Sequence, residues 1–460
     1  MKVDDFGDRQ RRFLDEKLDK QRDTNIGKKL GIGSVTFSKL PLTSYSFYKP
    51  FFESPVEADL LHPLDRYVKA YTSGTMGKPK GYLLPMEWIL DNLRKTALTG
   101  IFLFSHDGSN YRFEVGDVIY RNSPGGSFIS GFMQEELDSG SYGFVKQVPD
   151  DQLPFKEKVE YFIDNHDKID LAYMNVPILL EEMYPQIGEA LELKGFFTQD
   201  SSSYVFRDEI RDLVGTPPKV FYGSTETNFC GLPSIEYPGA FFFDWRVVYP
   251  EFLPEDEAIS EDLKLLDDPP ETLQLTELRV GEKYQLIATP YLNDLTRYLM
   301  PDILKCIDDG DDILGVEAPI FLYYARCDRL ISLHNFTRIS YEELLTALRD
   351  ADIPFVDFTA RKELTNSYEY LKIYMEVSEQ MSAEEVTQRL HEQLMKLDRD
   401  WMDLTNFMGY RPLKVEMLRR GTFNSYLQKR KGLPKITHIG MKHDQLELLL
   451  RCHREVSGDK

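Results

Sequence analysis

From about residue 51 to residue 319, short apolar runs alternate with segments of helical periodicity. Runs such as 116–120, 171–174 and 219–222 have the length of strands, and the charged, periodic stretch 156–162 indicates a helix between two of them. Strands that alternate with helices along a chain form sheets covered by helices. The alternation therefore predicts an α/β core.

Residues 271–290 have a different pattern. The stretches 273–278 and 284–289 alternate apolar and polar side chains on either side of a turn at 280–282. Such alternation is typical of antiparallel strands. The sequence therefore predicts a small β-rich region here.

A new pattern begins after Arg326. Ser340 with Glu343 and Ser382 with Glu385 have capping-box spacing, so each pair marks the start of a helix. The elements expected here are a helix at 341–349, strands at 353–358 and 370–377, a helix from 383 to about 397 and a strand at 413–418. This order predicts a compact second domain.

The length and composition agree with two domains. The chain has 460 residues, of which 42% are hydrophobic, enough to bury a large core in at least two domains. We expect an α/β fold with a large multi-subdomain N-terminal domain at 1–326, made of sheets covered by helices. A small, mobile α+β domain is expected at 327–460.

An excess of acidic residues limits the partners. The chain has 76 acidic and 55 basic residues, a net charge of −21, which repels nucleic acid and anionic membrane surfaces. The segment up to about Arg22 predicts a charged helix without the apolar core of a signal peptide, and no apolar run has the length of a membrane span. We therefore expect a cytoplasmic protein that binds neither nucleic acid nor membranes.

Cysteine and histidine spacing gives no sign of a structural metal. The four cysteines form no C-x-x-C pair, and the eight histidines form no H-E-x-x-H motif. We expect reduced thiols, no zinc site, and magnesium as the metal that enters with a nucleotide.

The segment 72–81 is rich in hydroxyls, glycines and lysines and follows a strand-like stretch at 68–71. Glycine lets a backbone approach a polyphosphate closely, while hydroxyls, amides and lysines supply hydrogen bonds and positive charge. A Walker-type loop needs a glycine and a hydroxyl where this chain has Thr72 and Pro79. The alternative to a phosphate site is a solvated turn.

Three further sites have residues suited to a nucleotide. A strand-like run ends in an aromatic ring, a glycine, two hydroxyls and a carboxylate, where Tyr222 can stack on a purine, Thr225 can bond a phosphate and Glu226 can hold magnesium. Asp302 can accept the hydroxyls of a ribose, and Arg326 can reach ribose or phosphate. The alternative for each residue alone is a surface ion pair or a turn.

Four motifs follow one another along the chain: TSGTMGKPKG at 72–81, YGSTE at 222–226, RYLMPD at 297–302 and ARCDRLI at 325–331. In this order they resemble the adenylate-forming superfamily of acyl- and aryl-CoA ligases, adenylation domains and related acid-activating synthetases. The resemblance implies a two-step reaction. A carboxylate attacks the α-phosphate of ATP, giving an acyl-adenylate and pyrophosphate, and a thiol or amine then displaces AMP.

The resemblance also implies a role for each motif. The residues implied to hold the β- and γ-phosphates of ATP are Thr72, Ser73, Gly74, Thr75, Gly77 and Lys80. Those implied to hold adenine, the α-phosphate and Mg²⁺ are Tyr222, Gly223, Ser224, Thr225 and Glu226, with Glu226 as the metal ligand. Asp302 is implied to bind the ribose. Arg326 and Asp328 mark a hinge about which the small domain rotates between the half-reactions.

The superfamily places one catalytic lysine near the C-terminus, where it bridges the substrate carboxylate and the α-phosphate. The candidates are Lys429, Lys431, Lys435 and Lys442. We favour Lys435 because residues 435–438 resemble the lysine segment of the acyl-acid amido synthetases, although Thr437 and His438 replace its Pro-Arg pair. Thr225 and Glu226 are expected to act with Lys435 in catalysis.

The chain has features of two branches of the superfamily, which differ in the acceptor of the second step. The short region before the 72–81 loop and the spacing from it to residues 222–226 resemble the phenylacetate-CoA ligases, whose acceptor is coenzyme A. Residues 248–254 and 421–423 resemble the acyl-acid amido synthetases, whose acceptor is an amino acid or amine. We expect an acyl- or aryl-CoA ligase, with amide formation as the alternative.

Departures from the superfamily pattern lie near the hinge. Ala325, Arg329 and Asn335 stand where glycine, aspartate and glycine are usual. These changes affect the second half-reaction more than the first, because this region contacts the acceptor after rotation. A third hypothesis is therefore a nucleotide-binding relative that no longer catalyses.

The pocket for the carboxylic acid is expected among residues 125–129, 174–177 and 228–231. Its aromatic content suits an aryl or medium-sized apolar acid, but the same side chains can equally fill the core. The residues expected to contact the acid are Gly126, Ser127, Asn228 and Phe229.

Overall fold

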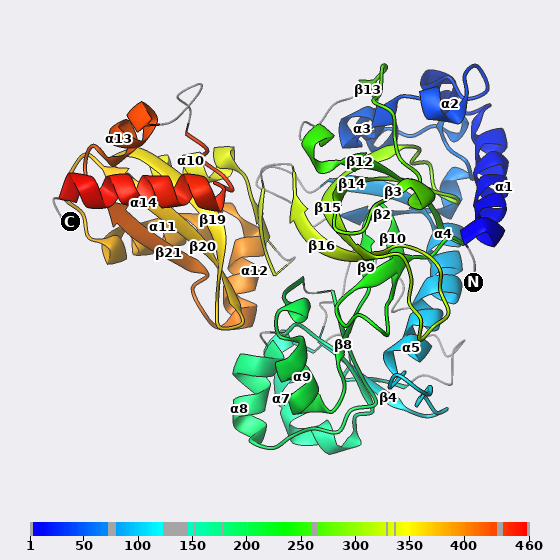
Figure 1. Ribbon diagram of the computed structural model, residues 1–460, viewed down its shortest axis with the longest axis horizontal. Coiled ribbons are helices and arrows are strands. Elements are labelled where there is room, and N and C mark those ends of the chain that lie inside the picture. Colours follow the sequence, from blue (N-terminus) through cyan, green and yellow to red (C-terminus); the bar gives the residue numbers. More distant parts are fainter. Residues whose placement is uncertain are drawn as a thin grey trace. The chain divides into compact units, whose positions relative to one another are not determined.

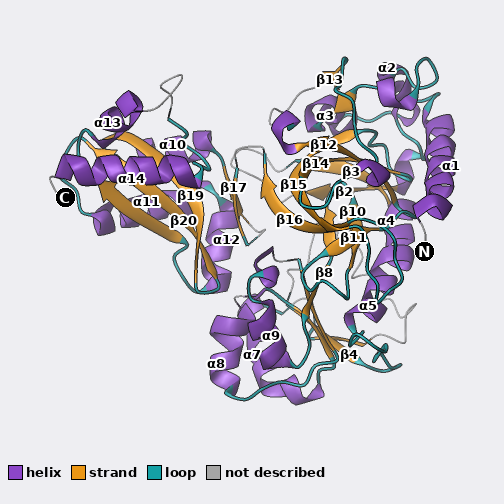
Figure 2. Cartoon of the chain, in the orientation of Figure 1, coloured by secondary structure: helices purple, strands orange, loops and turns teal. Residues whose placement is uncertain are grey.

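The structure is a computed structural model that describes residues 3–71, 80–122, 146–150, 153–176, 178–199, 201–259, 265–327, 330–334, 337–429 and 436–457. The described residues form two compact units, one up to residue 327 and one from residue 330 onward (Figure 1). Sheets with covering helices make up the first unit, and the second contains a three-stranded sheet with its own helices (Figure 2). These features confirm the predicted α/β fold class.

The N-terminal segment of the first unit consists of helices and short strands. They are α1 (Val3–Gln21), α2 (Asn25–Leu30), β1 (Leu42–Thr43), α3 (Tyr45–Glu53), β2 (Tyr67–Tyr71), β3 (Gly81–Pro85), α4 (Met86–Asn92) and α5 (Leu98–Phe104). Helix α1 confirms the charged helix predicted to about Arg22. Among the described residues, no helix is both long enough and apolar enough to cross a membrane.

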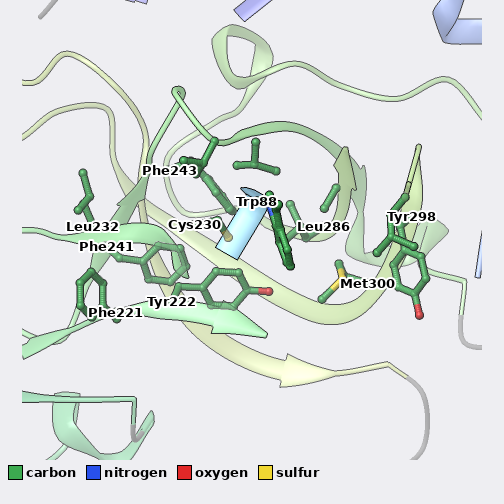
Figure 3. Packing of buried hydrophobic residues seen from close by; sticks show 14 of the residues in the cluster. Trp88, Phe221, Tyr222, Cys230, Leu232, Phe241, Phe243, Leu286, Tyr298 and Met300 are labelled. Carbon is green, nitrogen blue, oxygen red and sulfur yellow. The ribbon is translucent and has the colours of Figure 1, made fainter. Parts of the chain in front are cut away.

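The large sheet has nine strands, and its main path runs β12-β14-β15-β16-β11-β10-β9 with every neighbour antiparallel. Its strands include β9 (Tyr222–Ser224), β10 (Asn228–Pro233), β11 (Phe241–Phe243), β12 (Val248–Pro254), β13 (Leu265–Leu266), β14 (Lys283–Pro290), β15 (Tyr298–Asp308) and β16 (Ile320–Arg326). Strand β1 pairs with both β13 and β15. Trp88, Tyr222 and Phe241 lie in the buried aromatic core beside this sheet (Figure 3).

A second sheet in the first unit has five parallel strands in the order β5-β4-β6-β7-β8. Its elements are β4 (Val118–Arg121), β5 (Lys146–Val148), α7 (Phe155–Asn165), β6 (Leu171–Tyr173), α8 (Tyr184–Ile187), β7 (Gly195–Thr198), α9 (Arg207–Val214) and β8 (Pro218–Val220). Parallel neighbours need a crossover between them, and in the described part of the chain α7 lies between β5 and β6, α8 between β6 and β7, and α9 between β7 and β8. The alternation of apolar runs and helical segments thus predicted this sheet correctly.

The second unit contains the predicted order of helices and strands. Its elements are β17 (Ile331–Leu333), β18 (Thr337–Ile339), α10 (Tyr341–Asp350), β19 (Phe355–Thr365), β20 (Tyr368–Val377), α11 (Ala383–Leu397), α12 (Arg399–Met408), β21 (Leu413–Leu418), α13 (Thr422–Lys429) and α14 (His443–Ser457). Strand β20 is central, antiparallel to β19 and parallel to β21. Helices α12, α13 and α14 are additional to the sequence prediction.

Side-chain caps explain where two helices of the second unit, α10 and α11, begin. The Ser340 hydroxyl accepts the backbone N–H of Glu343 at 3.2 Å, and the Glu343 carboxylate accepts the backbone N–H of Ser340 at 2.7 Å. The Ser382 hydroxyl accepts the backbone N–H of Glu385 at 3.1 Å. These bonds satisfy N–H groups that a helix leaves without internal partners.

One predicted strand is wrong. Residues 273–278 form only a bridge between Leu273 and Phe252 and then a short 3₁₀ helix, Leu275–Glu277. The Glu277 carboxylate accepts the backbone N–H of Gln274 at 2.7 Å, so a local cap replaces the ladder of a strand. The other strand of the predicted region is confirmed as β14.

Because of Asp400, in the first turn of α12, we expect the stability of the second unit to depend on pH. Burial, together with the carboxylates of Asp398 and Asp403, raises the pKa of Asp400 from 3.8 to about 7. The unfolded chain therefore loses this proton at lower pH than the folded chain, and stability is lost as the pH rises from about 4 to about 7.

Asp400→Asn keeps the shape of the side chain without the titration. We expect the variant and the parent protein to be similarly stable at pH 4, and the variant to be the more stable at pH 8. Chemical denaturation, followed by the fluorescence of buried Trp401, measures the free energy of unfolding of the variant and of the parent protein at each pH. A stability difference that does not change between pH 4 and pH 8 would contradict the assignment.

Candidate active site

Strands β2 and β3 flank the 72–81 loop. They pair with Tyr71 opposite Gly81, so the two ends of the loop lie side by side. Lys80 is exposed, with its Nζ 5.3 Å from the ring centre of Tyr45, and the Tyr45 hydroxyl accepts the backbone N–H of Gly81 at 3.1 Å. The other residues predicted to hold the β- and γ-phosphates lie outside the described residues: Thr72, Ser73, Gly74, Thr75 and Gly77.

Strands β9 and β10 form a tight hairpin whose turn carries Thr225 and Glu226. Ser224 pairs with Asn228, and the Ser224 hydroxyl accepts the backbone N–H of Glu226 at 3.2 Å. A β-carbon at Gly223 would lie 2.5 Å from the backbone oxygen of Asn228, so only glycine fits this position without a shift of the backbone. The hairpin therefore fixes the position of the carboxylate predicted to bind metal.

The Glu226 side chain has a defined partner. The Tyr82 hydroxyl lies 2.9 Å from Glu226 Oε1 and 2.6 Å from the Tyr298 hydroxyl. Burial, with a contribution from the charge of Glu226, raises the pKa of Tyr82 well above its usual range, so the phenol keeps its proton and donates. The backbone oxygen of Glu226 accepts from Asn293 Nδ2 at 3.1 Å.

Asp302 lies on β15, and its side chain contacts residues on β16 and β9. It pairs with Arg326 across the β15–β16 ladder, and the Arg326 guanidinium lies 3.3 Å from its Oδ1. The Tyr222 hydroxyl donates to its Oδ2 at 2.7 Å. The Tyr222 ring stacks on Phe241 with centres 4.7 Å apart, and only 6% of Tyr222 is exposed. Adenine stacking on Tyr222 stays a prediction, whereas its hydrogen bond to Asp302 is part of the structure.

These contacts bring together segments that are far apart in the sequence. Tyr82 follows the 72–81 loop directly and reaches Glu226, while Tyr222 and Arg326 both reach Asp302. Strands β9, β15 and β16 of the nine-stranded sheet, together with β3 of the separate two-stranded sheet, therefore carry side chains that connect described parts of the motif segments. Asp328, the other residue predicted to mark the hinge, lies outside the described residues.

The residues predicted to contact the acid are only partly described. Gly126 and Ser127 lie outside the described residues. Asn228 is buried with a backbone φ of 53°, and its Nδ2 has no hydrogen-bond partner within the described part of the chain. Phe229 stacks on Phe221 with centres 4.6 Å apart. An unpaired buried amide is costly, so Asn228 is a donor suited to a ligand oxygen.

Sequence reasoning missed another buried amide. Asn122 follows β4 at the carboxyl end of the parallel sheet, and neither polar atom of its side chain has a partner among the residues that the structure describes. Ligands bind at this end of parallel strands. Tyr82 and Asn293 were missed as well, because neither residue lies in a recognisable motif. An apolar strand followed by a lone amide was the one signal available for Asn122.

Two of the four candidates for the catalytic lysine lie within the described residues. Lys431 and Lys435 lie outside the described residues. Lys429 forms an ion pair with Glu455, and Lys442 is exposed at the start of the last helical segment. The role of Lys435 stays a prediction.

The described residues fit a magnesium ion that arrives with a nucleotide. No group of three histidine, cysteine, aspartate or glutamate side chains that could hold a metal occurs among them. Mg²⁺ keeps several waters and is usually bound through one or two carboxylates together with substrate phosphates. Glu226, with one oxygen bonded to Tyr82 and the other without a hydrogen-bond partner in the described chain, suits that mode.

Solved structures share this fold at low sequence identity. A 2-hydroxyisobutyryl-CoA ligase in complex with 2-HIB-AMP and CoA has a TM-score of 0.63 at 13% identity, covering 98% of this chain and 93% of that one. The acyl acid amido synthetase AtGH3.15, in complex with 2,4-DB, has a TM-score of 0.53 at 14% identity, covering 96% and 93%. The chain therefore has the fold of the adenylate-forming ligases.

Two parts of the sequence match known domains. Residues 241–310 match the GH3 family central domain, and residues 341–435 match the GH3 family C-terminal domain. No curated protein sequence matches the chain. The domain matches, with the shared fold, confirm the predicted resemblance to the adenylate-forming superfamily and to its acyl-acid amido synthetases.

Proposed function

We propose that this protein is an ATP-dependent ligase that activates a carboxylic acid as an acyl-adenylate and releases pyrophosphate. The observation that carries the proposal is a set of side-chain contacts between the motif segments: Tyr82, which directly follows the 72–81 loop, contacts Glu226, and Tyr222 and Arg326 contact Asp302. The residues proposed for the metal and for the ribose are thus both next to strand β9: Glu226 lies in the turn that follows it, and Asp302 accepts from its Tyr222.

Each group of the proposed nucleotide has a chemical counterpart. ATP supplies the adenylyl group and Mg²⁺ neutralises its phosphates, with Glu226 as the proposed metal ligand. Lys80 and the 72–81 loop would hold the β- and γ-phosphates, and Asp302 would accept the ribose hydroxyls. Lys435 is the lysine that we propose to bridge the acid and the α-phosphate. The amide of Asn228 would donate to an oxygen of the acid or the adenylate.

For the second step we propose an amino acid or another amine as the acceptor. The matches to the GH3 central and C-terminal domains favour this acceptor, because the solved GH3 protein of similar fold is an acyl acid amido synthetase. Coenzyme A is the second candidate, favoured by the phenylacetate-CoA ligase-like spacing of the motifs. A cytoplasmic location and the absence of nucleic acid as a partner stay predictions.

Trapping with hydroxylamine tests the first step without knowledge of the acceptor. Hydroxylamine converts an acyl-adenylate to a hydroxamate, so incubation with ATP, Mg²⁺ and a panel of aryl and medium-length acids should give hydroxamate with at least one acid. AMP release with that acid, measured with coenzyme A and with each amino acid, then identifies the acceptor. ATP binding without hydroxamate from any acid would instead favour a relative that no longer catalyses.

A further inference from the structure

A chain of hydroxyl groups leads from the interior of the first unit to Glu226. The Tyr298 hydroxyl lies 2.6 Å from the Tyr82 hydroxyl, which lies 2.9 Å from Glu226 Oε1. Both tyrosines are buried, with exposed fractions of 3% and 0%. Buried polar groups are expensive to orient wrongly, so this arrangement determines which atoms donate and which accept.

The chemistry of the groups gives the chain a direction. An ionised carboxylate can only accept hydrogen bonds, so the single proton of the Tyr82 hydroxyl points to Glu226. The Tyr82 oxygen can then accept, and the Tyr298 hydroxyl donates to it. Each hydroxyl thereby polarises the next, which strengthens the bond that ends on Glu226.

Packing holds the Tyr82 ring in place. Tyr82 follows the first residue of β3, and its ring packs against Tyr45 and Phe52 with centres 5.1 and 5.9 Å away. Tyr298 begins β15 and packs on Tyr48 with centres 6.1 Å apart. Neither ring can swing away without disturbing the core, so the donor to Glu226 is preorganised.

Glu226 is held at two points. Its backbone oxygen accepts from Asn293, and its Oε1 accepts from Tyr82. Its Oε2 has no hydrogen-bond partner within the described residues. A hydrogen bond that fixes the first oxygen of a carboxylate gives the second oxygen a defined direction. The outer hydrogen-bond partners of metal ligands orient those ligands in this way.

We propose that Tyr82, supported by Tyr298, is a positioning residue that holds Oε1 of Glu226 and leaves Oε2 to bind the magnesium ion of ATP. This inference rests on the proposed function and extends it, because it adds to the metal site two tyrosines, one of which lies outside the four motifs. It also links the 72–81 loop to the metal, since Tyr82 follows that loop directly.

Magnesium-dependent ATP binding, measured by titration calorimetry, tests the proposal without requiring turnover. For Tyr82→Phe we expect the Mg²⁺ concentration at half-maximal ATP binding to rise about 10–100-fold, the usual cost of losing a partner of a metal ligand. Tyr298→Phe should change it in the same direction by less. ATP binding in the presence of a chelator should be the same in all variants, because a positioning role concerns the metal alone.

Tyr120→Phe is the matched control. Tyr120, in strand β4 of the parallel sheet, is as deeply buried as Tyr82, but its hydroxyl donates to the backbone oxygen of Lys158 in helix α7. We expect this variant to keep the parent magnesium dependence. An equal change in Tyr120→Phe and Tyr82→Phe would show a general loss of packing and overturn the proposal.

The remaining outcomes separate the inference from the function on which it rests. Parent protein with magnesium-dependent ATP binding, together with unchanged dependence in both Tyr82→Phe and Tyr298→Phe, would overturn the positioning role alone. Parent protein without magnesium-dependent ATP binding would overturn the proposed function and the inference with it. If Tyr82→Phe fails to fold, Tyr298→Phe decides, because it removes the donor behind Tyr82 and leaves Tyr82 in place.

Discussion

Glu226→Gln is expected to lower the rate of acyl-adenylate formation by on the order of 10²–10³-fold, the range seen when one group that stabilises developing charge is removed. The glutamine keeps the size of the side chain and can still accept from Tyr82. It loses the negative charge that a hard cation such as Mg²⁺ requires. The loss should therefore fall on the chemical step, not on folding.

Hydroxamate formation at saturating ATP and acid measures this effect. Glu282→Gln serves as the control. Glu282 is exposed in the turn before β14, and this substitution removes the same charge from the same unit. We expect the control to keep the parent rate. Parent-like activity in Glu226→Gln would remove Glu226 from the proposed site.

Arg297→Ala is expected to destabilise the first unit by about 3–5 kcal/mol, the cost of leaving a buried charge without its partner. Arg297 is fully buried and forms a bidentate pair with Glu251 at 3.0 and 3.1 Å. Its remaining donors reach the backbone oxygens of Ser38 and Leu40 and the Thr272 hydroxyl. All five donors of the guanidinium are therefore used.

The position of Arg297 connects its stability role to the site. Its backbone adopts a left-handed conformation, φ 46°, directly before Tyr298 and β15. Loss of the guanidinium would thus release the start of the strand that carries both Tyr298 and Asp302. We expect weaker magnesium-dependent ATP binding to accompany the lower stability.

Chemical denaturation followed by tryptophan fluorescence measures the predicted destabilisation, since Trp88 and Trp245 lie in the first unit. Arg211→Ala is the matched control. Arg211 pairs with Asp208 at 3.1 Å on an exposed helix face, where such a change costs within about 0.5 kcal/mol. Equal stability of the two variants would contradict the account of Arg297.

Local signals predicted much of the second unit. The capping boxes at Ser340 and Ser382 determine two helix starts through bonds between residues three positions apart, so the sequence contains the necessary information. The stretch 273–278 was mispredicted because alternating apolar residues occur both in strands and in irregular segments that pack on a sheet. Only the pairing partner separates these cases, and sequence alternation does not identify it.

The site was predicted less completely than the fold. Glu226, Asp302 and Arg326 were candidates because the order of their motifs along the chain is distinctive, and their roles in the site stay predictions. Tyr82 was not found, because its contact with Glu226 spans 144 positions and depends on the pairing of β2 with β3. In the sequence, Arg297 is recognisable only as part of a motif. Its buried ion pair with Glu251 is known only from the structure.

Exchange of labelled pyrophosphate into ATP tests the central claim most directly, because it reports reversible adenylate formation and needs no acceptor. Our account predicts exchange that depends on both Mg²⁺ and a carboxylic acid, with at least one acid of an aryl and medium-length panel, in the absence of coenzyme A and amino acids. Magnesium-dependent ATP binding with no exchange for any acid across a broad panel would contradict it.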